Sequence, residues 1–534
     1  MDFTVPSLNY LGLLPILIVL GTACLGILAE AFLPRKARFA TQVGLAVLGL
    51  GAALGFIVAR WGEAGRGLLD PYAGSVVTGT VMVDGPTQVF WLVIFGFGLL
   101  AVVGFAERRV HAGATSFTPS AAAIPGSQAE TAAATAGLAH SEVFPLALFS
   151  MSGMALMVSA NDLLVAFVGL EILSLPLYVL SGLARHRRLA SQEAALKYFL
   201  LGAAASAIFL FGAALLFGYA GSFSYETIAH TATAHTGSDA LLLAGLGLTG
   251  VGLLFKIGAV PFHSWMPDVY QGAPTPVTAF MSVCTKVAAV GGLLRLFYVA
   301  FGGLRWTWQP VLAGVAILTI IVGAVIAINQ ADVKRVLAYS SIAHAGFVLV
   351  PLVGALAVQS GLAAGEAGSV ASIMFYLIAY GFATIGCFTV IGLVRSQGRE
   401  ATNLTAWAGV GRRSPLLGFV MVVFLLSLAG IPLTAGFVGK LAAFVAAWRG
   451  GYWWLVFVAI VGSVIAVFIY IRVIAAMFFA KPAGETTADI AQPGVATWIV
   501  LAVCFVGTIG LGVAPGPVLD ALQAASSFLI PAGS

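Results

Sequence analysis

The chain has 534 residues, of which 60% are hydrophobic and only 8% are charged, and its formal net charge is +5. A water-soluble globular protein could not be built from this composition, so that class is excluded and an integral membrane protein is indicated. The apolar runs are about 20 residues long and are not ten-residue alternating segments, which predicts membrane-spanning helices.

About fourteen such runs follow one another along the chain. The first, Leu11 to Ala29, lacks the preceding basic region of a secretory signal and is followed directly by PRKAR, so we expect a retained span with its N-terminus outside. The predicted spans begin near Leu11, Gln42, Thr87, Val143, Asp162, Glu193, Leu241, Val277, Val311, Arg335, Val370, Leu416, Tyr452 and Val495.

Positive charge is distributed unevenly among the loops. Of the 25 lysines and arginines, 15 lie in loops after odd-numbered spans and four in loops after even-numbered spans. Because cytoplasmic loops carry an excess of basic residues, the odd-numbered loops are predicted to be cytoplasmic and both termini to lie on the outer side. One of these loops, Glu107 to Glu142, contains the low-complexity segment HAGATSFTPSAAAIPGSQAETAAATAG, which predicts a flexible cytoplasmic loop and not a domain.

Six basic residues remain within the predicted spans. Arg295 and Arg472 lie nearer to span ends, where a long side chain can carry its charge to the membrane surface. The other four are deeper, and one acid is similarly central. A charge at the centre of a bilayer helix costs roughly 2.5–3.5 kcal/mol on insertion scales, so such residues are candidates for function. The deep residues are Glu171, Lys197, Lys256, Lys286 and Lys440.

Two of the spans contain a proline near a deep lysine. Pro261, in FKIGAVPFHSW, offers no N–H to the carbonyl of Ile257, and Pro432, in GIPLTAGFVGKL, leaves that of Leu428 free. Such breaks persist at membrane depth only where they are buried or line a wet cavity. They lie in the seventh and twelfth spans, and this odd offset predicts two inverted five-helix repeats, each with a broken helix.

The runs LEILSLPLYVLSGL, EAALKYFLLGA, FKIGAVPFHSWMPDVYQGAPTPVTAFMS, NQADVKRVLAYSSIAHAGF and GIPLTAGFVGKL occur in this order. At successive positions they resemble the antiporter-like membrane subunits of respiratory complex I, over roughly Glu142 to Ala480. The SLPLY after Glu171 and a lysine in the twelfth span favour the N-type branch of that family. The M-type usually has a glutamate in the twelfth helix, and the L-type carries a long lateral helix.

The resemblance implies an all-α polytopic membrane protein with about 14 transmembrane helices. Residues 1–142 would hold three N-terminal helices and the cytoplasmic loop, and residues 481–534 a C-terminal helix. The first five-helix repeat would occupy residues 143–300 and the second, inverted repeat residues 301–480.

The resemblance also implies roles for the deep residues. Glu171 and Lys197 match the family's charged pair, and Lys256 matches its central proton carrier. Lys286 matches the connecting residue and Lys440 the terminal lysine. Unlike arginine, a buried lysine can release its proton, so lysines at the deep positions fit proton exchange better than fixed anion binding.

Three further residues fall in matching segments and could extend the proton path: His263, Lys334 and His344. Other interpretations stay open for them. The two histidines could serve helix-end or loop hydrogen bonds, and Lys334 could be a cytoplasmic anchor.

No nucleotide-binding loop, flavin fingerprint or metal-ligand cluster is present in the sequence, so no cofactor is expected in this chain. Flavin, iron–sulfur clusters and quinone are expected in partner subunits, and protons are moved by coupling to quinone reduction there. The expected partners are other membrane subunits, including neighbouring antiporter-like ones, and the lipid of a bacterial plasma membrane; no nucleic acid is expected. The alternatives are a subunit of a multi-subunit monovalent cation/proton antiporter and a passive scaffold.

Overall fold

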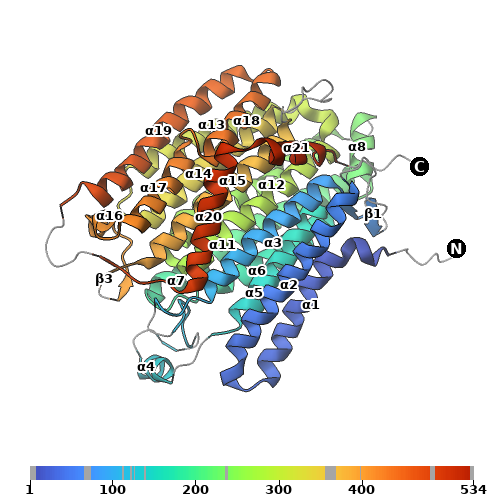
Figure 1. The fold of residues 1–534 in the computed structure, drawn as a ribbon. Coiled ribbons are helices and arrows are strands. Elements are labelled where there is room, and N and C mark those ends of the chain that lie inside the picture. Colours follow the sequence, from blue (N-terminus) through green and yellow to red (C-terminus); the bar gives the residue numbers. More distant parts are fainter. Residues whose placement is uncertain are drawn as a thin grey trace.

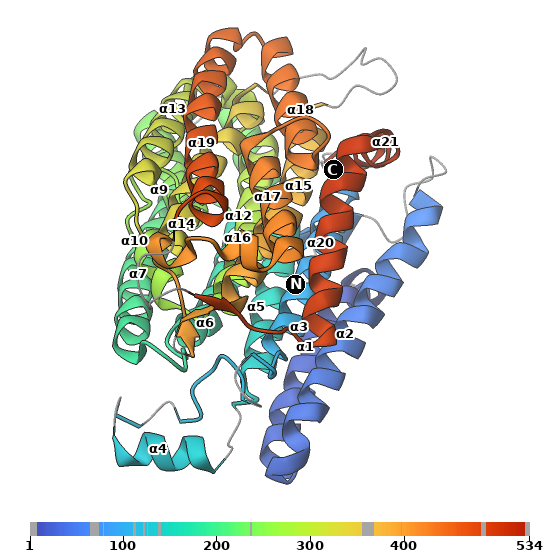
Figure 2. The same cartoon turned by 60° about the vertical axis from the view of Figure 1, so that its left-hand side comes forward.

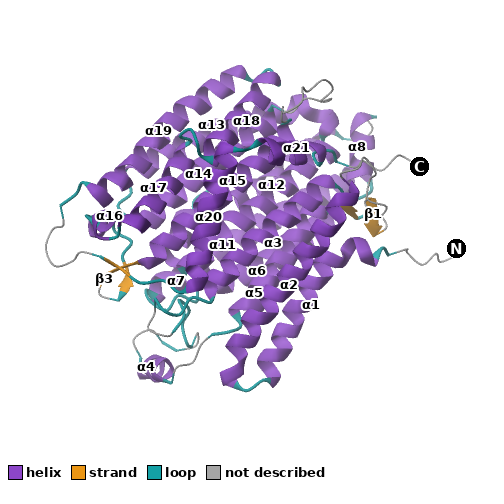
Figure 3. Ribbon diagram, viewed as in Figure 1, coloured by secondary structure: helices purple, strands orange, loops and turns teal. Residues whose placement is uncertain are grey.

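A computed structural model describes residues 8–528 except 65–73, 78, 111–113, 121–122, 125–126, 137–139, 235–237, 355–367, 397 and 482–487. The described residues form a bundle of closely packed helices with a few short strands at its ends (Figures 1 and 3). Three of the helices begin behind an aspartate whose carboxylate accepts a hydrogen bond from the backbone of the first turn, as helix N-caps do: Asp84, Asp162 and Asp332.

The first half of the chain contains α1 (Tyr10–Phe32), α2 (Arg35–Ala64), α3 (Gly85–Phe105), α4 (Gln128–Thr135), α5 (Val143–Ser159), α6 (Leu163–Ser181), α7 (Arg188–Ala220), α8 (Tyr225–Thr233), α9 (Asp239–Ile257), α10 (Trp265–Gly272) and α11 (Thr275–Phe280). The π-helical turn η1 (Met281–Thr285), α12 (Lys286–Arg295) and a second π-helical turn, η2 (Leu296–Ala300), continue α11.

The second half contains the short 3-10 turn η3 (Gly302–Leu304), α13 (Arg305–Ile328), α14 (Val333–Val353), α15 (Ser369–Leu393), the 3-10 turn η4 (Leu404–Trp407), α16 (Val410–Arg413), α17 (Pro415–Ala429), α18 (Ala435–Arg449), α19 (Trp453–Phe478), α20 (Val495–Val513) and α21 (Gly516–Ala524).

Among the described residues, twelve helices are long and apolar enough to cross a membrane. The two other predicted spans are present in shorter form, as the 17-residue α5 and as the pair α17 and α18, with 15 residues each. Each of the fourteen predicted runs therefore coincides with a helix or a broken helix. The predicted all-α polytopic fold is confirmed.

The first predicted helix break is present between α9 and α10. α9 ends at Ile257, the next residue Gly258 has a left-handed backbone (φ 77°), and the helix resumes only at Trp265. Glycine adopts this conformation without a steric cost, and Pro261 within the gap cannot continue the helix.

The second predicted break, between α17 and α18, has the same construction. α17 ends at Ala429, Gly430 is left-handed (φ 84°), and α18 begins at Ala435 beyond Pro432. The two breaks lie five spans apart, as the predicted inverted repeats require.

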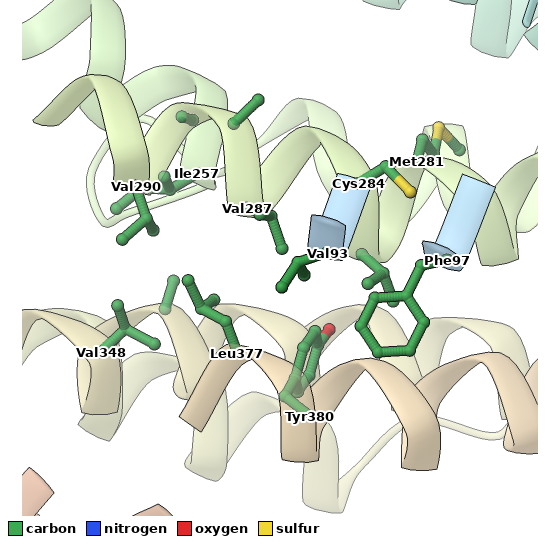
Figure 4. Close-up of a cluster of buried hydrophobic side chains, with 14 of the residues drawn as sticks. Val93, Phe97, Ile257, Met281, Cys284, Val287, Val290, Val348, Leu377 and Tyr380 are labelled. Atoms are coloured by element: carbon green, nitrogen blue, oxygen red, sulfur yellow. The ribbon is translucent and has the colours of Figure 1, made fainter. Parts of the chain in front are cut away.

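The most buried part of the bundle lies between these breaks. In the most apolar 18-residue stretch of each span, every residue is buried for the segment from α11 to η2. The buried share is 94% for α14 and 83% for α15, compared with 28% for α20. Figure 4 shows part of this interior, where Val93 and Phe97 of α3 lie between η1 and α12 on one side and Leu377 and Tyr380 of α15 on the other. Polar groups placed here are shielded from lipid, so charges inside the bundle need partners within it.

Short strands, which the apolar pattern did not predict, lie outside the spans. β1 (Gly74–Val77) pairs antiparallel with β2 (Val81–Val83). β3 (Val394–Ser396) is the central strand of a small antiparallel sheet with β4 (Arg399–Glu400) and β5 (Asp489–Ile490). In Figures 1 and 2 this second sheet and α4 lie toward the same end of the bundle, and α21 lies toward the other.

The sequence predicted that the whole low-complexity loop would be flexible, but part of it is packed against the helices. Phe117 is buried and packs edge-on against Phe105 at the end of α3, with ring centroids 5.3 Å apart. The N–H of Thr118 donates to the carbonyl of Leu183 at 2.9 Å. This part of the loop is therefore attached to the turn between α6 and α7. Residues 111–113, 121–122, 125–126 and 137–139 of the loop lie outside the described residues.

Candidate functional site

Lys256 lies in the last turn of α9, directly before the first break, and is 3% exposed. Its ammonium donates to Ser174 Oγ on α6 at 2.8 Å and to Tyr198 OH on α7 at 3.2 Å. The indole of Trp265 stacks on the Tyr198 ring, with centroids 4.6 Å apart, and donates its N–H to the carbonyl of Phe255 at 3.0 Å. Hydroxyl oxygens and ring faces thus take the place of water around this charge.

Lys286 follows the π-helical turn η1 and is 2% exposed. Its ammonium donates to the backbone carbonyl and to the hydroxyl of Ser341 on α14, the latter at 2.6 Å. Tyr380 on α15 donates to the same hydroxyl at 2.7 Å, and its ring centre lies 5.2 Å from the ammonium. π-Helical turns occur frequently at functional sites, and this one ends at the buried lysine.

Lys440 lies on α18, just after the second break, and is 5% exposed. Its ammonium donates to the backbone carbonyls of Leu428 at 3.1 Å and Ala429 at 2.8 Å, and to Ser463 Oγ on α19 at 2.9 Å. The Leu428 carbonyl is the one that Pro432 was predicted to leave free. An ammonium has three N–H donors, so this set of three acceptors satisfies all of them.

α14 runs from the Lys286 site to the Lys440 site. Ser341, His344 and Phe347 are spaced three residues apart along it and therefore share one face. Ser341 binds Lys286, and the Phe347 ring centre lies 4.9 Å from the Lys440 ammonium. His344 stands between these two contacts and is 4% exposed.

The His344 imidazole is hydrogen-bonded through both nitrogens. Nδ1 lies 2.7 Å from Tyr376 OH on α15, and Nε2 lies 3.2 Å from Tyr470 OH on α19. Tyr470 is also bonded to Ser340, the neighbour of Ser341. The imidazole and the hydroxyls can each donate or accept a proton. These contacts fit the proton-path interpretation of His344 better than the helix-end one.

Glu171 and Lys197, which match the family's charged pair, are not in direct contact in this structure. The Lys197 ammonium lies 2.6 Å from Glu193, one turn earlier on α7, and 2.8 Å from Asp268 on α10. Two carboxylates therefore compensate its charge, and its side chain is 42% exposed at the edge of the bundle. Glu171 on α6 is half-buried, and its Oε1 has no hydrogen-bond partner among the described residues.

The two remaining accessory candidates differ in their surroundings. Lys334 at the start of α14 is 1% exposed and donates to the carbonyl of Ala273 at 2.7 Å, so it is not the exposed surface anchor that was one alternative. His263 lies in the first break, where its carbonyl accepts the N–H of Met266 at 3.0 Å. Its Nδ1 is buried and lacks a hydrogen-bond partner within the described part of the chain.

The prediction that Arg295 reaches the membrane surface is also wrong. Its guanidinium is fully buried and lies 2.7 Å from the carboxylate of Asp84, the N-cap of α3, and 2.8 Å from Thr87 Oγ1. The bonds tie α12 to the start of α3. Arg472 donates to the carbonyl of Gln330 at 3.0 Å, beyond the end of α13. Both arginines are thus structural partners of helix ends.

Sequence reasoning missed the hydroxyl groups that hold the lysines. Ser174 could have been found, because it stands three residues after Glu171 and so on the same helix face. Tyr198 and Ser341 lie in quoted motifs, but nothing local marks them as partners of Lys256 and Lys286. Ser463 lies in a plain apolar run.

The arrangement can exchange protons, since it joins ammonium groups to hydroxyls and an imidazole within a dry interior. No group of three or more His, Cys, Asp or Glu side chains is placed to hold a metal ion in the part of the chain that the structure describes.

Comparisons with known proteins show the family to which the chain belongs. Residues 160–466 match the family described as NADH:quinone oxidoreductase/Mrp antiporter, TM. The NADH-quinone oxidoreductase subunit N of a Nocardioides species is 52% identical, over 99% of this chain and 100% of that protein. The protein of the same name from Mycobacterium tuberculosis is 48% identical, over 98% of this chain and 99% of its own length.

Solved structures show the same fold. A chain of respiratory complex I from Thermus thermophilus with bound aureothin is 33% identical and superposes with a TM-score of 0.74, covering 96% of this chain and 100% of that one. A chain of the Mrp complex from a Dietzia species superposes with a TM-score of 0.78 over 96% of this chain and 97% of its own, but at 20% identity. The second likeness is one of fold alone.

Proposed function

We propose, from the premise that this chain belongs to the NADH-quinone oxidoreductase subunit N family, that it moves protons along its buried lysines when other subunits reduce quinone. The names of the relatives support a membrane subunit of that enzyme. The proton path, its coupling to quinone and the roles of single residues are the proposal itself.

The observation that most supports this function is the row of side chains on α14 between Lys286 and Lys440. Lys286 contacts Ser341, His344 follows on the same face of α14, and the Phe347 ring of that helix lies against Lys440. A hydroxyl and an imidazole, which can donate and accept protons, therefore lie between two buried ammonium groups, and the Phe347 ring, which carries no proton, lines the end next to Lys440. A structural role alone would not require lysine at both ends, because apolar residues pack the same space without a desolvation cost.

Lys256 is proposed as the central carrier at the start of the proton path. Its partners Ser174 and Tyr198 are hydroxyls, which can accept from the ammonium and can donate to the neutral amine. The half-buried Glu171 lies three residues before Ser174 on α6 and interacts electrostatically with Lys256, so it is placed to influence that lysine. We assign Glu171 to this role, and Lys286 and Lys440 to onward transfer.

The surroundings of the chain follow from the same proposal. Flavin, iron–sulfur clusters and quinone belong to partner subunits, neighbouring antiporter-like subunits pack beside this one, and the complex lies in the bacterial plasma membrane with both termini of this chain outside. The repeats are proposed to span residues 143–300 and 301–480. Purification of the native complex with flavin-containing and iron–sulfur partners would support this function, and their lack would favour a cation/proton antiporter.

The decisive experiment replaces Lys256 by methionine in the assembled complex. Methionine fills nearly the same space and removes the charge, so assembly is expected near the wild-type level. Proton pumping driven by NADH oxidation in membrane vesicles should be largely lost. The matched control is Lys481→Met, which removes an exposed lysine beyond α19 and should pump normally. Wild-type pumping by an assembled Lys256→Met complex would refute the carrier role.

A further inference from the structure

Asp268, a residue to which no role has been assigned above, occupies a junction between three helices. It lies on α10, the second half of the first broken helix, and is partly exposed. Its Oδ2 accepts from Lys197 of α7 at 2.8 Å, and its Oδ1 accepts from Arg335 of α14 at 2.7 Å. Each carboxylate oxygen thus holds a different helix, and both hydrogen bonds are charge-assisted.

The same short helix carries the ring that orients the partner of Lys256. Trp265 stands three residues before Asp268, one turn away on α10. Its ring lies nearly parallel to that of Tyr198, at an interplanar angle of 5°, and Tyr198 OH accepts from Lys256 at 3.2 Å. α10 therefore contacts the ring whose hydroxyl binds Lys256.

Tertiary contacts fix the position of α10: besides Asp268 and Trp265, its Gln271 accepts from Arg335 at 3.0 Å and donates to Asp332 at 3.1 Å. The helix has only eight residues, no side chain caps its N-terminus, and the chain before it is the break itself. A helix of two turns is not stable on its own, so its placement depends on tertiary contacts. Lys197 and Tyr198 are adjacent on α7 and hold α10 at two points, by charge at Asp268 and by stacking at Trp265.

We propose that Asp268 is a positioning residue for proton transfer at Lys256, acting as a clamp that binds α10 to α7 and α14 and so holds Trp265 against Tyr198. This inference rests on the proposed function and extends it to the control of the central lysine. It also links the two repeats, because Arg335 begins the helix that carries Ser341 and His344 of the onward path.

The test uses the purified complex and three variants. Asp268→Asn keeps the size of the side chain and weakens both charged contacts, whereas Asp268→Glu keeps the charge. Glu193→Gln is the matched control, because it removes the other carboxylate from Lys197 at 2.6 Å without touching α10. Hydrogen exchange of the backbone amides of Met266, Asp268, Val269 and Tyr270 reports the clamp, and the ratio of protons pumped to electrons transferred reports its consequence.

Asp268→Asn is expected to raise the exchange of these amides roughly tenfold or more, as loss of a charged hydrogen bond predicts. On the proposed function Lys256 carries protons and no electrons, so the proton-to-electron ratio should fall at least about twofold while quinone reduction continues. Asp268→Glu should restore the ratio, and Glu193→Gln should leave the exchange of α10 unchanged.

Wild-type exchange in Asp268→Asn would overturn the clamp, and faster exchange with an unchanged ratio would overturn the positioning role. Should Asp268→Asn fail to assemble, Lys197→Gln removes one of the two contacts of Asp268, and unchanged exchange in that variant would overturn the proposal equally. The exchange measurement stands apart from pumping. Normal pumping by Lys256→Met would therefore refute the proposed function without deciding the fate of the clamp.

Discussion

Both broken helices hold a buried lysine beside the interruption, but the two lysines have different hydrogen-bond partners. At the first break, Lys256 precedes the interruption and is held by the hydroxyls of Ser174 and Tyr198. At the second, Lys440 follows the interruption and is held by the carbonyls of Leu428 and Ala429 with Ser463. A hydroxyl can donate or accept, whereas a carbonyl can only accept.

This difference indicates a division of labour between the two lysines. The first environment accommodates both the ammonium and the neutral amine, because its hydroxyls can reverse their hydrogen bonds. The second satisfies the three N–H donors of the ammonium at once, whereas a neutral amine has only two to offer. On the proposed function, Lys256 would change its protonation among hydroxyls that adapt to it, and Lys440 would give up one of its three hydrogen bonds when it releases its proton.

The largest expected effect comes from removing the ammonium at the second break. Lys440→Met leaves the carbonyls of Leu428 and Ala429 buried without a donor, at about 1–3 kcal/mol for each unsatisfied group. We expect less assembled complex and a lower thermal midpoint than for Lys256→Met, measured by native gel and by thermal inactivation of the membranes. Lys256→Met leaves only hydroxyls, which can rotate to other acceptors.

The control for this prediction is Lys440→Arg. Arginine keeps the charge and the donors, so the complex should assemble, but it cannot release a proton at accessible pH, so pumping should be largely lost. Equal stability of Lys440→Met and Lys256→Met would contradict the contrast between carbonyl and hydroxyl partners.

A smaller effect is expected from Tyr198→Phe at the first break. This change removes one acceptor of Lys256 while it keeps the ring that stacks on Trp265. A hydrogen bond to a charged group contributes about 1.5–3 kcal/mol, so proton transfer through Lys256 should slow roughly tenfold or more. Pumping rates in vesicles measure this. Tyr219→Phe is the matched control, since Tyr219 lies on the same helix α7 but donates its hydroxyl to the carbonyl of Thr231 at 3.0 Å; an equal loss in both variants would argue against the Tyr198 hydroxyl.

The contrast between the breaks also shows what sequence reasoning could reach. Lys256, Pro261, Pro432 and Lys440 are visible because a charge or a proline in an apolar run is anomalous by itself. Span number and the broken helices followed from such local signals. The Leu428 carbonyl could even be named in advance, because a proline always frees the carbonyl four residues earlier.

The partners of the lysines could not be reached in this way, because they depend on tertiary packing. Ser174 and Tyr198 are 82 and 58 residues from Lys256 in the chain, and Asp268 is 71 residues from Lys197. The family resemblance suggested Glu171 as the partner of Lys197, and the nearer carboxylates of Glu193 and Asp268 take that place. Serine and tyrosine are common in membrane helices, so no local pattern distinguishes those that bind an ammonium.

A still smaller coupling is expected between Glu171 and Lys197, because the structure gives them no direct contact. Glu171→Gln and Lys197→Met should therefore act nearly independently on complex stability, with an interaction energy within about 0.5 kcal/mol. The cycle is measured by thermal inactivation of assembled complexes. The cycle of Lys197→Met with Asp268→Asn serves as the comparison and should be clearly non-additive. An interaction energy of several kcal/mol between Glu171 and Lys197 would show that they pair in the assembled enzyme.

The smallest effect is expected from substitution of Glu107, which lies beyond the end of α3 and outside both helix breaks. It gives a reference against which the effects at the breaks can be compared. Burial by itself would raise the pKa of this carboxyl, but hydrogen bonds from Thr497 and from the backbone N–H groups of Gly494 and Arg109 outweigh it and lower the pKa. Gly494 is the N-cap of α20, so the carboxylate also lies at the positive end of that helix.

A carboxyl with a lowered pKa in the folded state contributes stability that is fully present above its unfolded pKa, and this stability is lost as pH falls through the lower, folded value. Glu107→Gln should therefore lower the stability of the complex at pH 7 by no more than about 1 kcal/mol, because the group is partly solvated. This loss would appear as a slightly lower thermal midpoint. The difference from wild type should be unchanged at pH 5 and should shrink only below about pH 4. Thermal inactivation of both complexes across this range measures it. If the wild type instead gained stability relative to Glu107→Gln as pH falls from 7 to 5, the pKa of Glu107 would be raised, and burial would outweigh the capping of α20.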